Sequence, residues 1–210
     1  MRSFHRKSKI PDLAPMLAER GLPTESLDRW AAEPKLDGWR VTVSVADGRV
    51  AVRTPPGHDI TDSVPGIEAL AAGGHDLLLD GELMAGAEWP SGVYAPAPRL
   101  AGRSRRPATP VSFLAFDLLW LDGELLVDRP YLERRTTLEE LPIARPCGVV
   151  PRFSGPDRDD LLAACAELDV EVVVFKQLTS QYHPGERRPC WRTVRVSIRA
   201  PLDTQRRGPW

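Results

Sequence analysis

The chain of 210 residues contains little cysteine, little histidine and no long apolar run. Its three cysteines, Cys147, Cys165 and Cys190, are far apart and lack the CxxC spacing of zinc sites, so neither a zinc site nor a disulfide framework is indicated. The four histidines show no paired spacing for a metal or a catalytic triad. No apolar segment follows the basic N-terminus, so neither export nor a membrane span is expected. Together these absences predict a protein of a reducing, cytoplasmic compartment.

Charge is distributed unevenly, although 28 basic and 29 acidic side chains leave a formal net charge of -1. Between Thr54 and Pro98 there are seven acids and no lysine or arginine, whereas residues 181–210 carry seven arginines against two acids. A basic cluster in a segment with proline and glycine consists of Arg99, Arg103, Arg105 and Arg106. Such a cluster suits a DNA backbone, and a solvated loop is the alternative interpretation.

Hydrophobic periodicity predicts an α+β fold with mixed sheets and no regular βαβ alternation. Apolar and polar residues alternate on both sides of Asp47-Gly48, which predicts a β-hairpin. The Pro-rich segment 88–110 is expected to be a long irregular loop. Further strands are expected at 75–86, 111–121, 171–178 and 191–198, and helices at 22–32, 59–74, 130–141 and 157–168.

Charged residues occur in predicted apolar strands or at their ends, namely at Lys35, Glu82, Glu171 and Lys176. A charge in such a place needs a partner or a ligand, so four of them indicate one shared polar cleft. A lysine there can bind phosphate as a point charge, or act as a nucleophile if burial and neighbouring cations lower its pKa. Two separated carboxylates suit a divalent metal that holds a nucleotide's phosphates.

Five motifs, taken in order, carry a resemblance. KLDGWR at 35–40 resembles the K-x-D-G-x-R motif of covalent nucleotidyltransferases, the superfamily of ATP-dependent DNA ligases, RNA ligases and capping enzymes. LLLDGEL is similar to its D-G-E motif, SFLAFDLLWLDG to F-D-x-L, EVVVFK to E-G-V-V-x-K, and WRTVR to W-x-K-x-K. The stretches APMLAER, RPYLERRTTLEEL and SQYHPGERRPCW resemble the bacterial ATP-dependent DNA ligases. An RNA ligase or capping-type enzyme is therefore the less favoured alternative.

The resemblance implies a fold and a reaction. The fold would be the ATP-grasp-like adenylation domain of DNA ligases, with two antiparallel β-sheets and flanking helices around an ATP cleft. Lys35 would be the catalytic nucleophile that attacks the α-phosphate of ATP and forms lysyl-AMP. AMP would then pass to the 5′-phosphate at a nick in double-stranded DNA, during repair or recombination.

Further roles follow from the same resemblance. Glu82 and Glu171 would hold Mg²⁺ or Mn²⁺, and the arginines of 99–106 would contact DNA. The ATP-binding set would comprise Glu33, Lys35, Arg40, Glu82, Phe116, Lys176 and Arg195, with Phe116 stacked on adenine and Lys176 and Arg195 at the α-phosphate.

Three positions depart from the motifs. Val172 replaces a glycine, Thr193 replaces a lysine of W-x-K-x-K, and Pro55 stands where a nucleic-acid-binding arginine is expected. Residues 1–196 are interpreted as the adenylation domain and 197–210 as a short Arg/Pro-rich tail, without the OB-fold domain of the family. A partner chain would then be needed for full ligation. A degenerate ATP- or DNA-binding module without catalysis is the second hypothesis.

Overall fold

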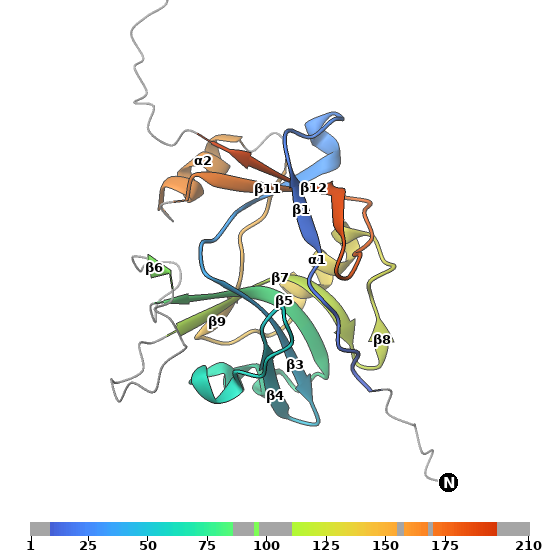
Figure 1. Ribbon diagram of the computed structural model, residues 1–210, viewed down its shortest axis with the longest axis vertical. Coiled ribbons are helices and arrows are strands. Elements are labelled where there is room, and N and C mark those ends of the chain that lie inside the picture. Colours follow the sequence, from blue (N-terminus) through green and yellow to red (C-terminus); the bar gives the residue numbers. More distant parts are fainter. Residues whose placement is uncertain (1–8, 86–94, 97–110, 155–157, 168–169, 197–210) are drawn as a thin grey trace, which may run out of the picture.

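A computed structural model describes residues 9–85, 95–96, 111–154, 158–167 and 170–196. Within these residues two β-sheets face each other (Figure 1). Sheet A contains, in spatial order, β1 (Leu17–Arg20), β12 (Arg187–Arg195), β11 (Val172–Gln177), β2 (Trp30–Pro34) and β10 (Phe153–Ser154). Its strands run antiparallel except for the pair β1 and β12, which is parallel.

Sheet B is built around a long central pair of strands. Its order is β4 (Arg49–Arg53), β3 (Trp39–Ala46), β5 (Leu77–Ala85), β7 (Val111–Leu121) and β8 (Glu124–Leu125). The short strands β6 (Ala95–Pro96) and β9 (Cys147–Val149) extend it beside β5 and β7, and β9 runs parallel to β7. The hairpin predicted around Asp47-Gly48 is confirmed, since β3 pairs antiparallel with β4. Both turn residues adopt positive φ, as tight hairpin turns require.

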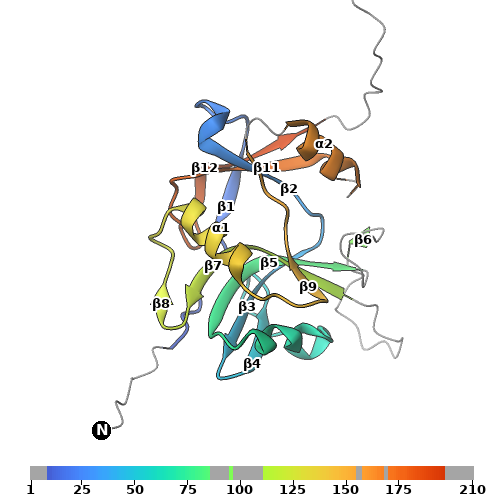
Figure 2. The same ribbon diagram turned by 180° about the vertical axis from the view of Figure 1, so that it is seen from behind.

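Helices cover the margins of the sheets. α1 (Tyr131–Glu140) lies against β7, as seen from behind in Figure 2, and α2 (Arg158–Glu167) packs on β2 and β10. Three 3₁₀ helices span Leu27–Arg29, Thr61–Ser63 and Ile67–Gly73. The helix expected over 22–32 was wrong except for the three-residue 3₁₀ helix Leu27–Arg29, because residues 22–26 are not helical. Residues 30–34 form β2, which is buried along its whole length and therefore shows no polar-apolar alternation.

Apolar packing joins the two sheets. One cluster packs sheet B against the 3₁₀ helix at 67–73 and includes the fully buried Val43, Leu79 and Phe113. A second cluster links sheet A and α2 to sheet B through Ala32, Leu114 and other buried side chains. The third surrounds Trp191 and Tyr182 and includes Met16, so the segment before β1 is packed into the core.

A buried ion pair fixes α1 to sheet B. Arg134 donates two hydrogen bonds to Asp117 of β7, at 2.8 and 2.9 Å, and both side chains are 0% exposed. The same guanidinium donates to the carbonyl oxygens of Arg129 and Ser180. A buried charge is tolerated only when it is paired and hydrogen-bonded, and these contacts meet that requirement for Arg134.

The predicted α+β fold with two largely antiparallel sheets is confirmed, and the two parallel pairs lie at the margins. Most of the predicted loop 88–110 and the tail 197–210 fall outside the described residues, as do the arginines of 99–106. Among the described helices, none is long and apolar enough to span a membrane.

Candidate functional site

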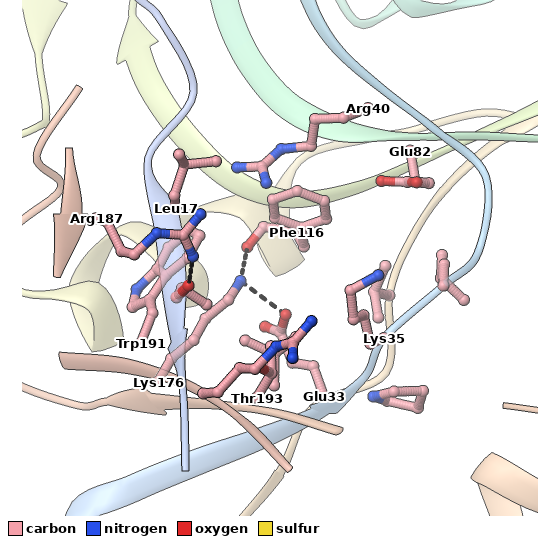
Figure 3. A pocket seen from close by; sticks show the side chains of 16 residues that line it. Leu17, Glu33, Lys35, Arg40, Glu82, Phe116, Lys176, Arg187, Trp191 and Thr193 are labelled. Carbon is pink, nitrogen blue, oxygen red and sulfur yellow. Dashed lines mark hydrogen bonds and ion pairs between the residues drawn. The ribbon is translucent and has the colours of Figure 1, made fainter. Parts of the chain in front are cut away.

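A pocket of about 330 Å³ opens between the two sheets (Figure 3). Its walls come from strands that are far apart in the sequence, which places side chains of both sheets in one cavity. The volume is within the range of small-molecule sites. The lining consists of Leu17, Ala18, Arg20, Glu33, Pro34, Lys35, Leu36, Arg40, Glu82, Phe116, Val150, Val174, Lys176, Arg187, Trp191 and Thr193.

Lys35 lies on the segment that crosses from sheet A to sheet B. It follows β2 directly, and its backbone N–H donates to the carbonyl oxygen of Val172 on β11 at 2.8 Å. Three residues later, a Cβ at Gly38 would overlap the Leu83 carbonyl oxygen, so only glycine lets the segment pass so close to β5. These contacts fix the backbone on both sides of the lysine, whose side chain remains exposed.

Glu82 faces the pocket from β5. Its Oε1 accepts a hydrogen bond from the Gly38 N–H at 3.1 Å. Burial raises the pKa of this carboxyl to about 7, although Arg40, the Gly38 N–H and Lys35 each lower it. Glu82 is thus a carboxylate whose charge changes near neutral pH and which lies beside two cations.

Lys176 and Glu33 form a buried ion pair. The Lys176 Nζ lies 2.7 Å from a Glu33 oxygen, and both side chains are at most 3% exposed. The Tyr131 hydroxyl donates to the other Glu33 oxygen at 2.5 Å, and the Arg135 Nε lies 3.4 Å from that same oxygen. Burial lowers the pKa of Lys176, while Glu33 and Asp117 oppose that shift. Glu33 therefore provides the principal counter-charge for Lys176.

Aromatic rings enclose the same ammonium group. The Lys176 Nζ lies 4.4 Å from the Trp191 ring centroid, 4.5 Å from that of Phe116 and 5.2 Å from that of Tyr131. It also donates to the Phe116 carbonyl oxygen at 3.1 Å. Three ring faces at cation–π distance hold the ammonium with little freedom.

Arg40 is held over the Phe116 ring by sheet B. Its guanidinium donates two hydrogen bonds of 2.6 Å to Asp80 on the neighbouring strand β5 and lies 4.8 Å from the ring centroid. Asp80 accepts a further hydrogen bond from the Tyr182 hydroxyl, which in turn accepts the backbone N–H of Met16. Arg40 is consequently oriented by contacts that reach the segment before β1.

Six of the seven predicted ATP-binding residues line this one pocket: Glu33, Lys35, Arg40, Glu82, Phe116 and Lys176. The seventh, Arg195, does not line it and pairs with Glu171 at 3.3 Å, with both side chains largely exposed. Glu82 and Glu171 are therefore not brought together in the lining. Among the described residues no three histidine, cysteine or acidic side chains gather as a metal site.

Sequence reasoning missed several contributors, above all Trp191, Tyr131, Asp80 and Arg20. Trp191 belongs to a recognised motif, but its contact with Lys176 follows from the pairing of β11 and β12, which places these two residues opposite each other. Tyr131 begins a predicted helix whose docking site is set by tertiary packing. Asp80 was visible as the first residue of D-G-E, and its partner Arg40 lies opposite Glu82 one strand away.

Comparison with known proteins identifies the family of the chain. Residues 15–194 match the ATP dependent DNA ligase domain. The chain belongs to the ATP-dependent DNA ligase family. A relative of this family, the multifunctional non-homologous end joining protein LigD of Mycolicibacterium smegmatis, is 35% identical over 189 residues, which cover 89% of this chain and 24% of the relative. The chain thus spans about a quarter of the length of this relative.

Solved ligase structures share the fold. The ligase domain of M. tuberculosis LigD superposes with a TM-score of 0.71 at 34% identity, over 87% of this chain and 59% of that domain. A mycobacterial DNA ligase D complexed with ATP and MES gives a TM-score of 0.72 at 34% identity, over 87% of this chain and 60% of the other. The two sheets therefore have the fold of a nucleotidyltransferase domain of the ligase family.

Proposed function

We propose that this domain transfers AMP from ATP to its own Lys35. The observation that supports this most directly is the convergence of Lys35, Glu82, Phe116 and Lys176, from four separate motifs, in one pocket. In the proposed step the neutral Lys35 Nζ attacks the α-phosphorus, a P–N bond forms, and the P–O bond to pyrophosphate breaks. One of the two protons of the amine is lost to solvent or to a neighbouring base.

The pocket residues divide into three functions in this proposal, namely binding of the adenine, of the ribose or a strand phosphate, and of the α-phosphate. Phe116 supplies a ring face for adenine, and Glu33 with the backbone beside Lys35 reads its edge. Arg40 contacts the ribose, or the terminal phosphate of a nicked strand. Lys176, whose direction is fixed by three aromatic rings, offsets charge at the α-phosphate.

A divalent ion fits this site only with help from the nucleotide. Glu82 is the one carboxylate in the lining besides Glu33, which Lys176 already neutralises. Mg²⁺ is commonly held by one or two carboxylates together with substrate phosphates and water, so Glu82 would suffice as the protein ligand in the pocket. Bound there, Mg²⁺ would withdraw charge from the phosphates. Glu171 would join it only through a change in its pair with Arg195.

The adenylation test is direct. Incubation of the chain with ATP labelled at the α-phosphate and Mg²⁺ is expected to give a covalent protein adduct, stable to denaturation and absent in Lys35→Ala. Wild-type protein that binds ATP but never acquires label would contradict the proposal. GTP in place of ATP is expected to label poorly, and equal labelling would favour a capping-type enzyme.

We further propose that the adenylate is passed to a 5′-phosphate at a nick in double-stranded DNA, in the cytoplasm. The relatives named LigD and the solved ligase domains contain more chain than residues 1–196. We therefore expect sealing to depend on an OB-fold module or a repair partner in addition to this domain. Efficient closure of a nicked duplex by the purified chain alone would contradict that dependence.

A module that binds nucleotide without catalysis is the second candidate. Two observations favour it. The Thr193 hydroxyl donates a hydrogen bond to the Glu19 carbonyl oxygen, and Arg195 pairs with Glu171 outside the lining. Neither position of W-x-K-x-K then supplies a cation to the pocket. Labelling that appears only in the double variant Val172→Gly and Thr193→Lys would support this candidate over the first.

A further inference from the structure

The cations of the pocket differ in how far they are already neutralised. Lys176 is paired with Glu33 at 2.7 Å, and Arg40 with Asp80 at 2.6 Å. Arg187 donates to the Ala18 carbonyl oxygen and so holds β1 against β12. Of the lining cations, Lys35, Arg20 and Arg187 have no acidic side chain within ion-pair distance among the described residues. Lys35 is the proposed nucleophile and Arg187 is bound to a backbone carbonyl, which leaves Arg20 as the counter-charge for a phosphate chain.

The position of Arg20 is set by strand pairing. β1 and β12 pair in parallel, and an irregularity after Ala18 moves the register forward on β12, from Arg188 to Arg192. As a result Arg20 lies opposite Thr193, and both residues line the pocket. The pairing is closed by the Thr193 Oγ1, which donates to the Glu19 carbonyl oxygen, and by the Gly21 N–H, which donates to the Thr193 carbonyl oxygen.

Glu19, the acidic neighbour of Arg20 in β1, is paired with a different arginine. Glu19 is outside the pocket lining and pairs with Arg192 at 3.2 Å, where the Arg192 side chain is 17% exposed. Consecutive residues of a strand project to opposite faces, which separates Glu19 from Arg20. Arg20 therefore keeps its charge in the pocket while the adjacent carboxylate is neutralised on the other side of β1.

We propose that Arg20 binds the phosphate chain of the nucleotide, and that it supplies from β1 the positive charge that Thr193 does not supply from β12. This inference rests on the proposed adenylation reaction and adds a residue to its binding site. A guanidinium is suited to the task because it is permanently charged and donates two parallel hydrogen bonds to phosphate oxygens.

The test separates phosphate binding from binding of the base. In the Lys35→Ala background, which prevents adduct from accumulating, affinities for ATP and for adenosine are measured by calorimetry. Arg20→Gln is expected to weaken ATP binding about tenfold, the size of one charge-assisted contact, and to leave adenosine binding within about twofold. Arg188→Gln, which changes the same charge on β12 outside the lining, is expected to alter neither.

Relocation of the charge gives a second, independent readout. With Lys35 present and no DNA added, Arg20→Gln is expected to raise the ATP concentration needed for half-maximal labelling. Two variants are expected to bring this concentration most of the way back to the wild-type value. They are Arg20→Lys and, separately, the double variant Arg20→Gln with Thr193→Lys. Because DNA is absent, this effect reports the nucleotide's phosphates and not the phosphate of a nicked strand.

The outcomes distinguish this inference from the proposed function. If wild-type protein labels normally and Arg20→Gln matches Arg188→Gln in ATP affinity, the role of Arg20 is overturned while adenylation stands. If Arg20→Gln loses ATP and adenosine affinity in parallel, the residue is structural and the inference is again overturned. If wild-type protein never labels, yet Arg20→Gln lowers ATP affinity selectively, adenylation fails and the phosphate contact is retained.

Discussion

At the scale of single residues, the pocket depends on buried charges that neutralise one another. Glu33 is contacted by Lys176, Tyr131 and Arg135, which come from β11 and α1. Such a carboxylate cannot be removed without leaving a buried ammonium group unpaired. Motif reasoning identified Glu33 and Lys176 separately, but it could not identify them as partners, because their contact follows from the antiparallel register of β2 and β11.

Neutralising Glu33 should therefore be costly. Glu33→Gln is expected to lower the free energy of unfolding by about 3–5 kcal/mol, the usual cost of breaking a buried pair. Glu171→Gln, which removes an exposed pair with Arg195, is the matched control and is expected to change it by less than about 1 kcal/mol. Urea denaturation followed by circular dichroism measures both, and equal losses in the two variants would refute this account.

Glu82 should make stability depend on pH. Its folded pKa is raised from 4.5 to about 7, so between these values the folded state binds more protons than the unfolded state. This contribution to stability is present in full below pH 4.5 and is lost as the pH rises through 7. Glu82→Gln removes the titration, so relative to wild type it is expected to gain up to about 3 kcal/mol between pH 4.5 and 8. Unfolding curves of both proteins at several pH values provide the measurement. A difference that stays constant with pH would show that the Glu82 pKa is not raised.

At the scale of elements, the long strands were predictable and the short ones were not. β3, β5, β7 and β11 have apolar patterns of sufficient length, whereas β9 and β10 contain three and two residues and carry no periodicity. β1, with four residues, is defined only by its parallel pairing with β12. Since Arg20 lies in β1, the same limit that concealed the strand also concealed the residue.

The segment between β2 and β3 should tolerate no side chain at Gly38. Gly38→Ala places a Cβ against the Leu83 carbonyl oxygen and Met84 Sδ, so the segment that carries Lys35 must move. We expect adduct formation to fall at least tenfold, since displacement by about 1 Å can cost a hundredfold in rate. Gly73→Ala, where the nearest atoms lie 3.6 Å from the new Cβ, is the control and should label like wild type. Labelling of Gly38→Ala at the wild-type rate would contradict the close approach.

At the scale of the whole molecule, the pocket lies between two sheets that also share apolar clusters. Lys176, Trp191 and Thr193 approach from sheet A, while Arg40, Glu82 and Phe116 approach from sheet B (Figure 3). A nucleotide that contacts both walls would link the sheets. The order of five motifs predicted this convergence, whereas the identity of the wall residues outside the motifs required the strand pairing.

Nucleotide binding should consequently stabilise the entire domain. At a free ATP concentration of about 100 times the dissociation constant, the gain is about 2.7 kcal/mol, which raises the melting temperature by several degrees for a domain of this size. Thermal unfolding of Lys35→Ala with ATP, GTP or adenosine checks this without covalent labelling. An equal shift with GTP and ATP would show that the pocket does not select adenine.

The parallel pairing of β1 with β12 has a consequence for hydrogen exchange. β1 forms the outer edge of sheet A, and outside its ladder it is held by a few contacts, such as the hydrogen bonds from Leu17 to Glu186 and from Gly21 to Thr193. Edge segments open with a smaller free energy than central strands, so the amides of β1 should exchange before those of β11. Each opening would carry Arg20 away from the cavity while the remaining strands of sheet A stay paired. The electrostatic potential of the site would then fluctuate with the fraying of one four-residue strand, and a bound nucleotide would slow that exchange.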